Sequence, residues 1–153
     1  MLGIALGLHV LSVVLWVGGM FFAHMILRPA AVTQLEPPLR LALWRHVFNR
    51  FFPLVWVIIV LVPLTGILII MMLGGFATQP VFVHIMTTLG IIMIMIFLHV
   101  FFAPFKRLKQ RLDEGDVPAA AQQLNKIRFL VGLNTVIGFI TILVATTGKY
   151  LLA

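Results

Sequence analysis

Residues 51–73 read FFPLVWVIIVLVPLTGILIIMML, a run of 23 residues without a charged side chain. A helix that crosses the hydrocarbon core of a bilayer needs about 20 mostly apolar residues, so this run predicts a transmembrane helix. Runs of the same kind cover residues 2–27, 81–103 and 129–152. The chain of 153 residues is 62% hydrophobic, which leaves too few polar side chains for the surface of a soluble domain. We therefore expect one all-α domain over residues 1–153, an integral membrane four-helix up-down bundle in a lipid bilayer.

The sequence lacks the features of a cleaved signal peptide, and it contains no cysteine. The first apolar run has no basic residue before it, and Arg28 and Pro29 follow where a cleavage site would need small residues. We therefore expect this run to stay in the membrane as a span and not to be a cleaved signal peptide. Cysteine does not occur in the chain, which excludes disulfides, thiolate metal sites and cysteine catalysis.

The basic residues predict how the bundle is inserted. Between the apolar runs lie the loops 28–50 and 104–128, and they hold ten of the eleven Lys and Arg residues: Arg28, Arg40, Arg45, Arg50, Lys106, Arg107, Lys109, Arg111, Lys126 and Arg128. Only Lys149 lies on the other side. Short loops rich in Lys and Arg face the cytoplasm, so we expect both termini outside the cytoplasm, in a bacterial-type inner membrane. The net charge of +7 then reflects topology and contact with anionic headgroups, not nucleic-acid binding.

Carboxylate chemistry inside the membrane is excluded by the placement of the acidic residues. Glu36, Asp113, Glu114 and Asp116 are the only acidic residues, and all four lie in the cytoplasmic loops. Ser12 is the only serine, and no acidic residue accompanies it within the spans. The candidates for chemistry that remain are the histidines, since ionisable residues in membrane spans are costly and usually functional.

Four histidines occur in two pairs of equal spacing. His9 and His24 in the first span are fifteen residues apart, and so are His84 and His99 in the third span. Fifteen residues of α-helix return to within about 60° of the same face, over a rise of roughly 22 Å. The first and third spans run in the same direction and lie diagonally across an up-down bundle. We therefore expect His9 level with His84 near the outer face, and His24 level with His99 near the cytoplasmic face.

Such pairs predict a bis-histidine site for haem b, in which two imidazoles bind the iron from opposite sides of the macrocycle. One haem or two would fit the pattern, with Trp16 and neighbouring phenylalanines as walls and Arg45 available for a propionate. His46 is an alternative to His24 as a ligand. Copper is the alternative metal, because imidazole and thioether also suit it. The histidines are also compatible with simple helix packing in a structural subunit.

The sequence resembles the CopD and HemJ families along most of its length. Leu8-His9-Val10 followed by Trp16-Val17-Gly18-Gly19 resembles the opening helix of both families. The third span, with Val83-His84-Ile85 and Leu98-His99-Val100, is similar to the third helix of HemJ. HemJ proteins are haem-b-binding membrane enzymes that oxidise protoporphyrinogen IX, and CopD proteins are associated with copper uptake or resistance. The resemblance implies haem binding by His9, with His84 or His99 as its partner.

The resemblance leaves the reaction open. Met86 stands where HemJ proteins have a lysine, and the Asn-Glu-x-Pro signature of their fourth span is missing here. We expect electron transfer or oxidoreductase activity coupled to a membrane quinone, with a redox partner protein as a further candidate. Copper transport or resistance and protoporphyrinogen IX oxidation are the alternatives. A homo-oligomer is compatible with the sequence.

Overall fold

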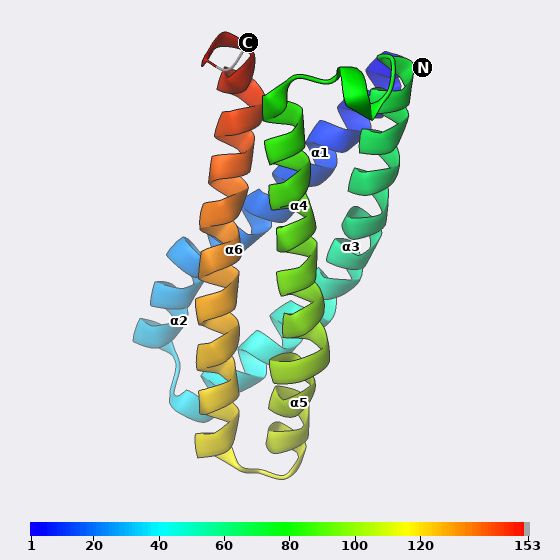
Figure 1. The fold of residues 1–153 in the computed structure, drawn as a ribbon. Coiled ribbons are helices and arrows are strands. Elements are labelled where there is room, and N and C mark those ends of the chain that lie inside the picture. The colour runs from blue at the N-terminus through cyan, green and yellow to red at the C-terminus, as the bar shows by residue number, and fades with distance from the viewer. Residues whose placement is uncertain (152–153) are drawn as a thin grey trace.

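The computed structural model describes residues 1–151, and every regular element within them is a helix (Figure 1). The elements are α1 (Leu2–Phe21), η1 (Phe22–Leu27), α2 (Arg28–Gln34), α3 (Pro37–Met72), η2 (Phe76–Thr78), α4 (Val81–Val100), η3 (Phe101–Phe105), α5 (Lys106–Asp113) and α6 (Val117–Leu151). They form four continuous helical stretches, each long and apolar enough to cross a membrane: Leu2–Gln34, Pro37–Met72, Val81–Asp113 and Val117–Leu151. The prediction of an all-α bundle with four spanning helices is confirmed.

The helices extend well beyond the predicted spans. Most of the segments 28–50 and 104–128, expected as loops, is helical, and only residues 35–36 and 114–116 separate the helices there. Once the peptide hydrogen bonds are formed inside the membrane, the helix continues into the headgroup region because each added residue gains one further bond. The fourth span was expected to end at residue 152, which lies outside the described residues.

Proline and aspartate determine where the helices break at the basic end of the bundle. Glu36 has extended backbone, and Pro37 occupies the first turn of α3, where its missing N–H is not needed. At the second break, Gly115 adopts a positive φ of 72°. The Asp116 carboxylate then accepts a hydrogen bond from the Ala119 N–H at 3.0 Å, as an N-cap of α6.

The connection between α3 and α4 depends on two glycines. Gly74 and Gly75 have φ values of 101° and 92°, which side chains other than glycine rarely adopt. This connection lies at the same end of the molecule as the start of α1 and the end of α6 (Figure 1). The link between α5 and α6 lies at the opposite end, so the termini share one side of the bundle, as an even number of spans requires.

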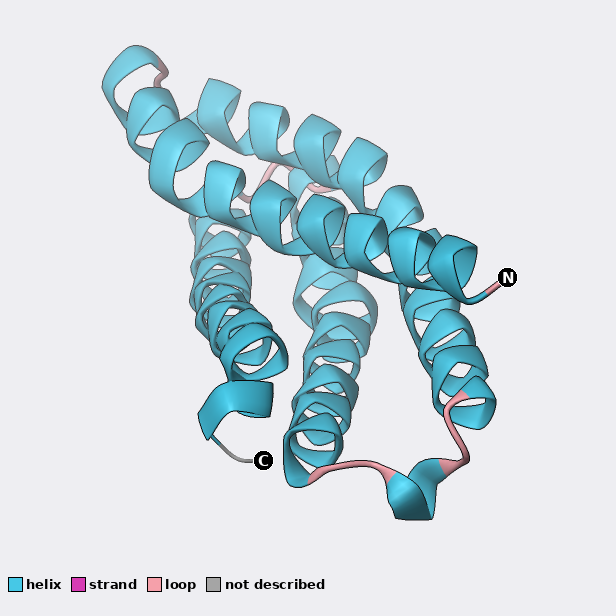
Figure 2. Cartoon of the chain, turned by 90° about the horizontal axis from the view of Figure 1, so that it is seen from above, coloured by secondary structure: helices cyan, strands magenta, loops and turns pink. Residues whose placement is uncertain are grey.

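The bundle consists of two helix pairs that cross obliquely. α4 and α6 run side by side, and α1 packs against α3 (Figures 1 and 2). α1 also contacts α6, so α6 touches both pairs. Large apolar side chains on the outer faces are exposed, as expected where lipid is the solvent.

Aromatic rings hold α3 against the third helical stretch. Phe52 stacks on Phe48 with ring centroids 5.0 Å apart and meets Phe105 edge-on at 4.7 Å. Phe97 packs edge-on against Phe52 at 5.6 Å. Edge-to-face pairs of this kind contribute about 0.5–1.5 kcal/mol each beyond the burial of their area. The core is therefore strongest in the half of the bundle that carries the basic residues.

Gly138 on α6 is the point at which α1 and α4 both approach this helix. A Cβ atom added at Gly138 would lie 2.8 Å from Val17 on α1 and 3.2 Å from Met93 on α4. Small residues allow such close helix approach in membranes, where packing drives association.

Replacing Gly138 with leucine should therefore destabilise the bundle. We expect Gly138→Leu to cost about 1–3 kcal/mol, because the core at this point has no space for a side chain. Thermal unfolding in detergent, followed by circular dichroism, measures the effect. Gly90→Leu is the matched control, since nothing lies within 4 Å of a Cβ atom at Gly90. Equal melting temperatures for the two variants would contradict this packing.

The basic residues predict that the end of the bundle with the α5–α6 link faces the cytoplasm. Alkaline phosphatase fused after residue 153 should then be active, because this enzyme folds only outside the cytoplasm. Green fluorescent protein at the same position should stay dark. If the fluorescent protein fusion is bright and the phosphatase fusion is inactive, the predicted orientation is wrong.

Candidate functional site

His9 lies on α1, half-buried against α3. Its Nδ1 is 3.1 Å from the carbonyl oxygen of Val62 and 3.0 Å from Oγ1 of Thr65. The Thr65 hydroxyl donates its own hydrogen to the Leu61 carbonyl at 2.6 Å, so its oxygen acts as an acceptor toward His9. Both neighbours of Nδ1 are therefore acceptors. The hydrogen bonds assign the proton to Nδ1 and leave the lone pair of Nε2 free.

His84 lies in the first turn of α4 and folds back on the α3–α4 connection. Its Nε2 is 3.2 Å from the carbonyl oxygen of Gln79, so this nitrogen is the donor. The imidazole also meets the ring of Phe76 edge-on, with centroids 4.5 Å apart. His84 therefore has Nδ1 free, on a ring held by the connection and not by α1.

His24 lies in a wider, π-helical turn, and His99 lies just before another. His24 is within η1, and its ring packs on α6, where a Cβ atom at Gly132 would be 3.0 Å from the imidazole. His99 is exposed and immediately precedes η3. Pro104 within η3 cannot donate a helical hydrogen bond, which explains the wider turn. Single π turns inside α-helices occur frequently at functional sites.

The histidines have different neighbours in this structure. α1 and α4 begin at the same end of the bundle (Figure 1). Yet His9 bonds to α3, His84 to the α3–α4 connection and His24 packs on α6, while His99 faces outward. Within residues 1–151, no three His, Asp or Glu side chains gather as they would around a metal ion. Each imidazole therefore has its own set of neighbours, and the histidines do not form a cluster.

The other candidate residues have diverse surroundings. Trp16 is buried, with 3% of its surface exposed, and it faces the interior of the bundle. Arg45 forms an ion pair with Asp113 of α5 at 2.6 Å, which occupies the guanidinium expected to meet a propionate. His46 is exposed on α3.

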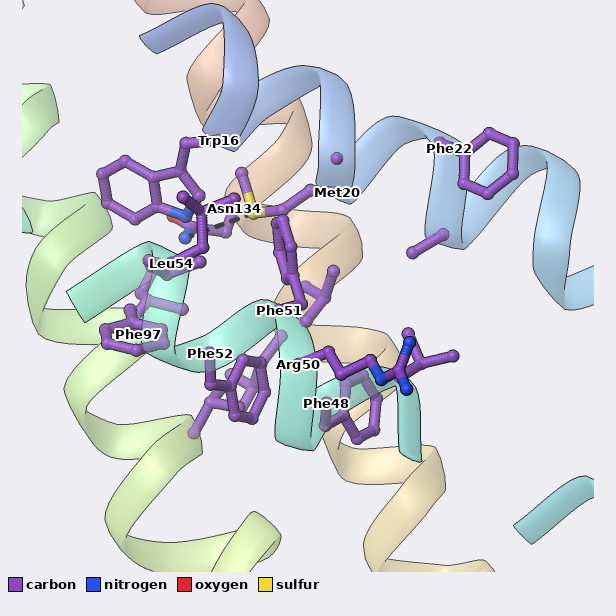
Figure 3. Close-up of a pocket in the computed structure, with 18 of the residues that line it drawn as sticks. Trp16, Met20, Phe22, Phe48, Arg50, Phe51, Phe52, Leu54, Phe97 and Asn134 are labelled. Atoms are coloured by element: carbon purple, nitrogen blue, oxygen red, sulfur yellow. Dashed lines mark hydrogen bonds between the residues drawn. The ribbon is translucent and has the colours of Figure 1, made fainter. Parts of the chain in front are cut away.

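A largely apolar cavity of about 410 Å³ opens between η1, α3, α4 and α6, on the basic side of Trp16 (Figure 3). Its wall is mostly aromatic and aliphatic, and it is lined by Trp16, Gly19, Met20, Phe22, Ala23, Leu27, Val47, Phe48, Arg50, Phe51, Phe52, Leu54, Val55, Ile96, Phe97, Val100, Leu130, Val131 and Asn134. No histidine is among these residues. The cavity is therefore a second candidate site, separate from the imidazoles.

Two polar side chains reach this cavity from different sides. Asn134 of α6 lies beside Trp16 and Met20, whereas Arg50 of α3 lies across the cavity near Phe48 (Figure 3). The histidine pattern gave no indication of this site. A lone asparagine in an apolar span was a signal for Asn134, but only the packing of four helices shows that it lines a cavity with Arg50.

Buried nitrogen donors without partners lie at the basic end of the bundle. Nε and Nη2 of Arg128 and Nε1 of Trp44 make no hydrogen bond with a described residue. The Arg128 guanidinium lies 5.8 Å from the centre of the Trp44 ring, a cation–π contact that replaces part of its hydration.

Comparison with known proteins gives one match. The CopD family, described as Copper resistance protein D, matches residues 45–147, from α3 almost to the end of α6. No curated protein and no solved structure matches the chain significantly. The family match covers about two thirds of the sequence and includes three of the four spanning helices. On this evidence, the protein is a multi-pass membrane protein that belongs to the CopD family.

Proposed function

We propose that this CopD-family protein binds haem b within the membrane and exchanges electrons with a membrane quinone. The environment of His9 is the observation that carries the proposal. Its Nδ1–H is held by the Val62 carbonyl and the Thr65 hydroxyl, so the lone pair of Nε2 is left free. Histidines that bind metals usually donate the other ring N–H to a carbonyl or carboxylate in this way.

The second axial ligand is proposed to come from α4. His84 keeps Nδ1 free, and the His99 side chain makes no hydrogen bond with a described residue. α1 and α4 approach each other across α6, where Asn134 lies within 3.7 Å of Met20 Sδ and 3.3 Å of the Met93 carbonyl. The residues fit a haem ligand at His9, while the side chains on α4 face other neighbours in this structure. Bound haem would supply one-electron redox chemistry.

Copper binding is the second candidate, and the description of the family favours it. Imidazole nitrogen and thioether sulfur are suitable copper ligands. Within the described residues, however, no cluster of three His, Asp or Glu side chains is present, so methionine sulfur would have to complete such a site. Haem iron needs only one or two imidazole ligands, so separate histidines fit haem binding better than copper binding.

Absorption spectra of the purified protein, oxidised and then dithionite-reduced, test the haem proposal. We expect a Soret band in the wild type and its loss in His9→Ala, because that change removes the axial nitrogen. Thr65→Val should keep the band but lower haem affinity about tenfold, as changes next to a metal-binding histidine usually do. Thr146→Val is the control, since this side chain is exposed on α6 and bonds only to carbonyls of its own helix.

Two results would overturn the proposal. One is a wild-type protein without a Soret band after expression with added haem. The other is full haem content in His9→Ala. Elemental analysis of the same samples distinguishes the copper candidate, which predicts copper without haem and altered copper tolerance when the gene is deleted.

A further inference from the structure

A groove of about 540 Å³ lies at the basic end of the bundle, where the third helical stretch and α6 run side by side (Figure 1). Ala103, Pro104 and Arg107 line it from one side, and Lys126 and Phe129 line it from α6. Pro104 lies in the wider turn η3, and Ala103 has only a methyl group, so side chains leave this space unfilled. We call it the α5–α6 groove.

The α5–α6 groove lies at the boundary of the lipid hydrocarbon. Ala103 ends one apolar run of the sequence and Phe129 begins the next, whereas Arg107 and Lys126 belong to the basic segment between them. The apolar residues of the groove therefore border the acyl chains, and its cations lie at the depth of the lipid headgroups. An occupant at this depth needs a polar head and an apolar body.

The two cations of the groove have no carboxylate partner. Arg107 lines it from α5 and Lys126 from α6, and the ion pairs found among residues 1–151 involve other residues. No acidic residue in the described part of the chain lines the groove. Both side chains are exposed, so a ligand reaches their nitrogens without displacing another part of the protein. The groove therefore favours a negatively charged group between its walls.

Asn125 adds a hydrogen-bond donor to the same wall. Its Oδ1 accepts a hydrogen bond from Arg128 Nη1 at 3.2 Å, so Nδ2 is the amide atom left for a ligand. Guanidinium, ammonium and this amide nitrogen all donate, and a phosphate has only oxygens that accept. Hydrogen bonds from charged donors to phosphate are about twice as strong as those between neutral groups.

We infer that the α5–α6 groove binds one anionic phospholipid, with the headgroup phosphate between Arg107 and Lys126 and an acyl chain along Phe129. Basic pockets between membrane helices bind anionic lipid headgroups in this way. A choline lipid also carries a phosphate, but its ammonium group meets only positive charge in a groove without a carboxylate. The inference goes beyond haem binding and does not depend on it.

Native mass spectrometry of the protein, purified in detergent and freed of lipid, tests this inference because it counts the lipids bound to each molecule. The probes are dioleoylphosphatidylglycerol and dioleoylphosphatidylcholine, which differ only in the headgroup. We expect the wild type to bind its first phosphatidylglycerol about tenfold more tightly than phosphatidylcholine, the scale of one or two basic side chains at a headgroup. Inorganic phosphate in large excess should not displace the lipid, because it has no acyl chain.

Three variants make the test specific. Arg107→Gln/Lys126→Gln removes both cations and should bind the two lipids equally. Lys106→Gln/Arg111→Gln removes the same charge from α5 at residues that do not line the groove, so it should keep the preference. Ala103→Trp fills the groove and leaves the cations in place, and it should weaken phosphatidylglycerol binding about tenfold. If Arg107→Gln/Lys126→Gln fails to fold by circular dichroism, the wild type and Ala103→Trp decide the matter.

A wild type that binds both lipids equally, or unchanged phosphatidylglycerol binding by Ala103→Trp, contradicts the inference. So does a preference that persists in folded Arg107→Gln/Lys126→Gln, or displacement of the lipid by inorganic phosphate. The same spectra report haem: haem lost from folded Arg107→Gln/Lys126→Gln would assign these cations to propionates instead and also contradict the lipid site. His9→Ala should lose haem but keep the lipid preference, so each proposal fails separately.

Discussion

Lipid offers no hydrogen bonds, and this constraint governs each part of the structure. Backbone groups satisfy it by forming helices, which continue from the membrane into the headgroup region on the basic side. Side chains satisfy it less completely. The hydroxyls of Thr135 and Thr141 return their hydrogens to the preceding turn of α6. His9 uses the Val62 carbonyl and the Thr65 hydroxyl on a neighbouring helix.

The groups that do not satisfy this constraint are the informative ones. Oδ1 of Asn134 is buried without a donor, and Asn134 is one of the residues around a cavity. Nε2 of His9 keeps a free lone pair because Nδ1 holds the proton. A buried acceptor without a donor raises the free energy of the protein. The Nε2 lone pair of the half-buried His9 is instead a free ligand atom.

Helix packing separates these two sites. The aromatic cluster around Phe52 holds α3 against α4 and η3, while α6 contacts both helix pairs. α1 crosses the α4–α6 pair obliquely and turns His9 toward α3 (Figure 1). The cavity forms further along α1, beyond Trp16, where η1 and α3 leave space that the side chains do not fill. His9 and His84 thus lie away from the cavity, whereas His24 and His99 lie on helical turns that neighbour it.

The sequence predicted properties that depend on residues close together in the chain, and it did not predict contacts between different helices. Hydropathy depends on residue order alone, so the sequence was enough to predict the four spans and the all-α class. A spacing of fifteen residues predicted that His9 and His24 lie near one face of their helix, and the same was expected of His84 and His99. In the structure His9 contacts α3, whereas His24, on a π-helical turn, packs on α6. Phase within one helix does not determine how that helix rotates against the others. For this reason the sequence did not show that His84 bonds to Gln79 or that Arg45 pairs with Asp113.

By itself, then, the sequence determined that the chain lies in a membrane, how many times it crosses, and which residue types are available for chemistry. Those properties follow from the cost of placing each side chain in lipid, which depends on composition and spacing alone. The tertiary structure decided which polar atoms have partners and where a cavity remains. These outcomes depend on crossing angles and on close approach at positions such as Gly138, where several helices meet, and no single stretch of sequence contains that information.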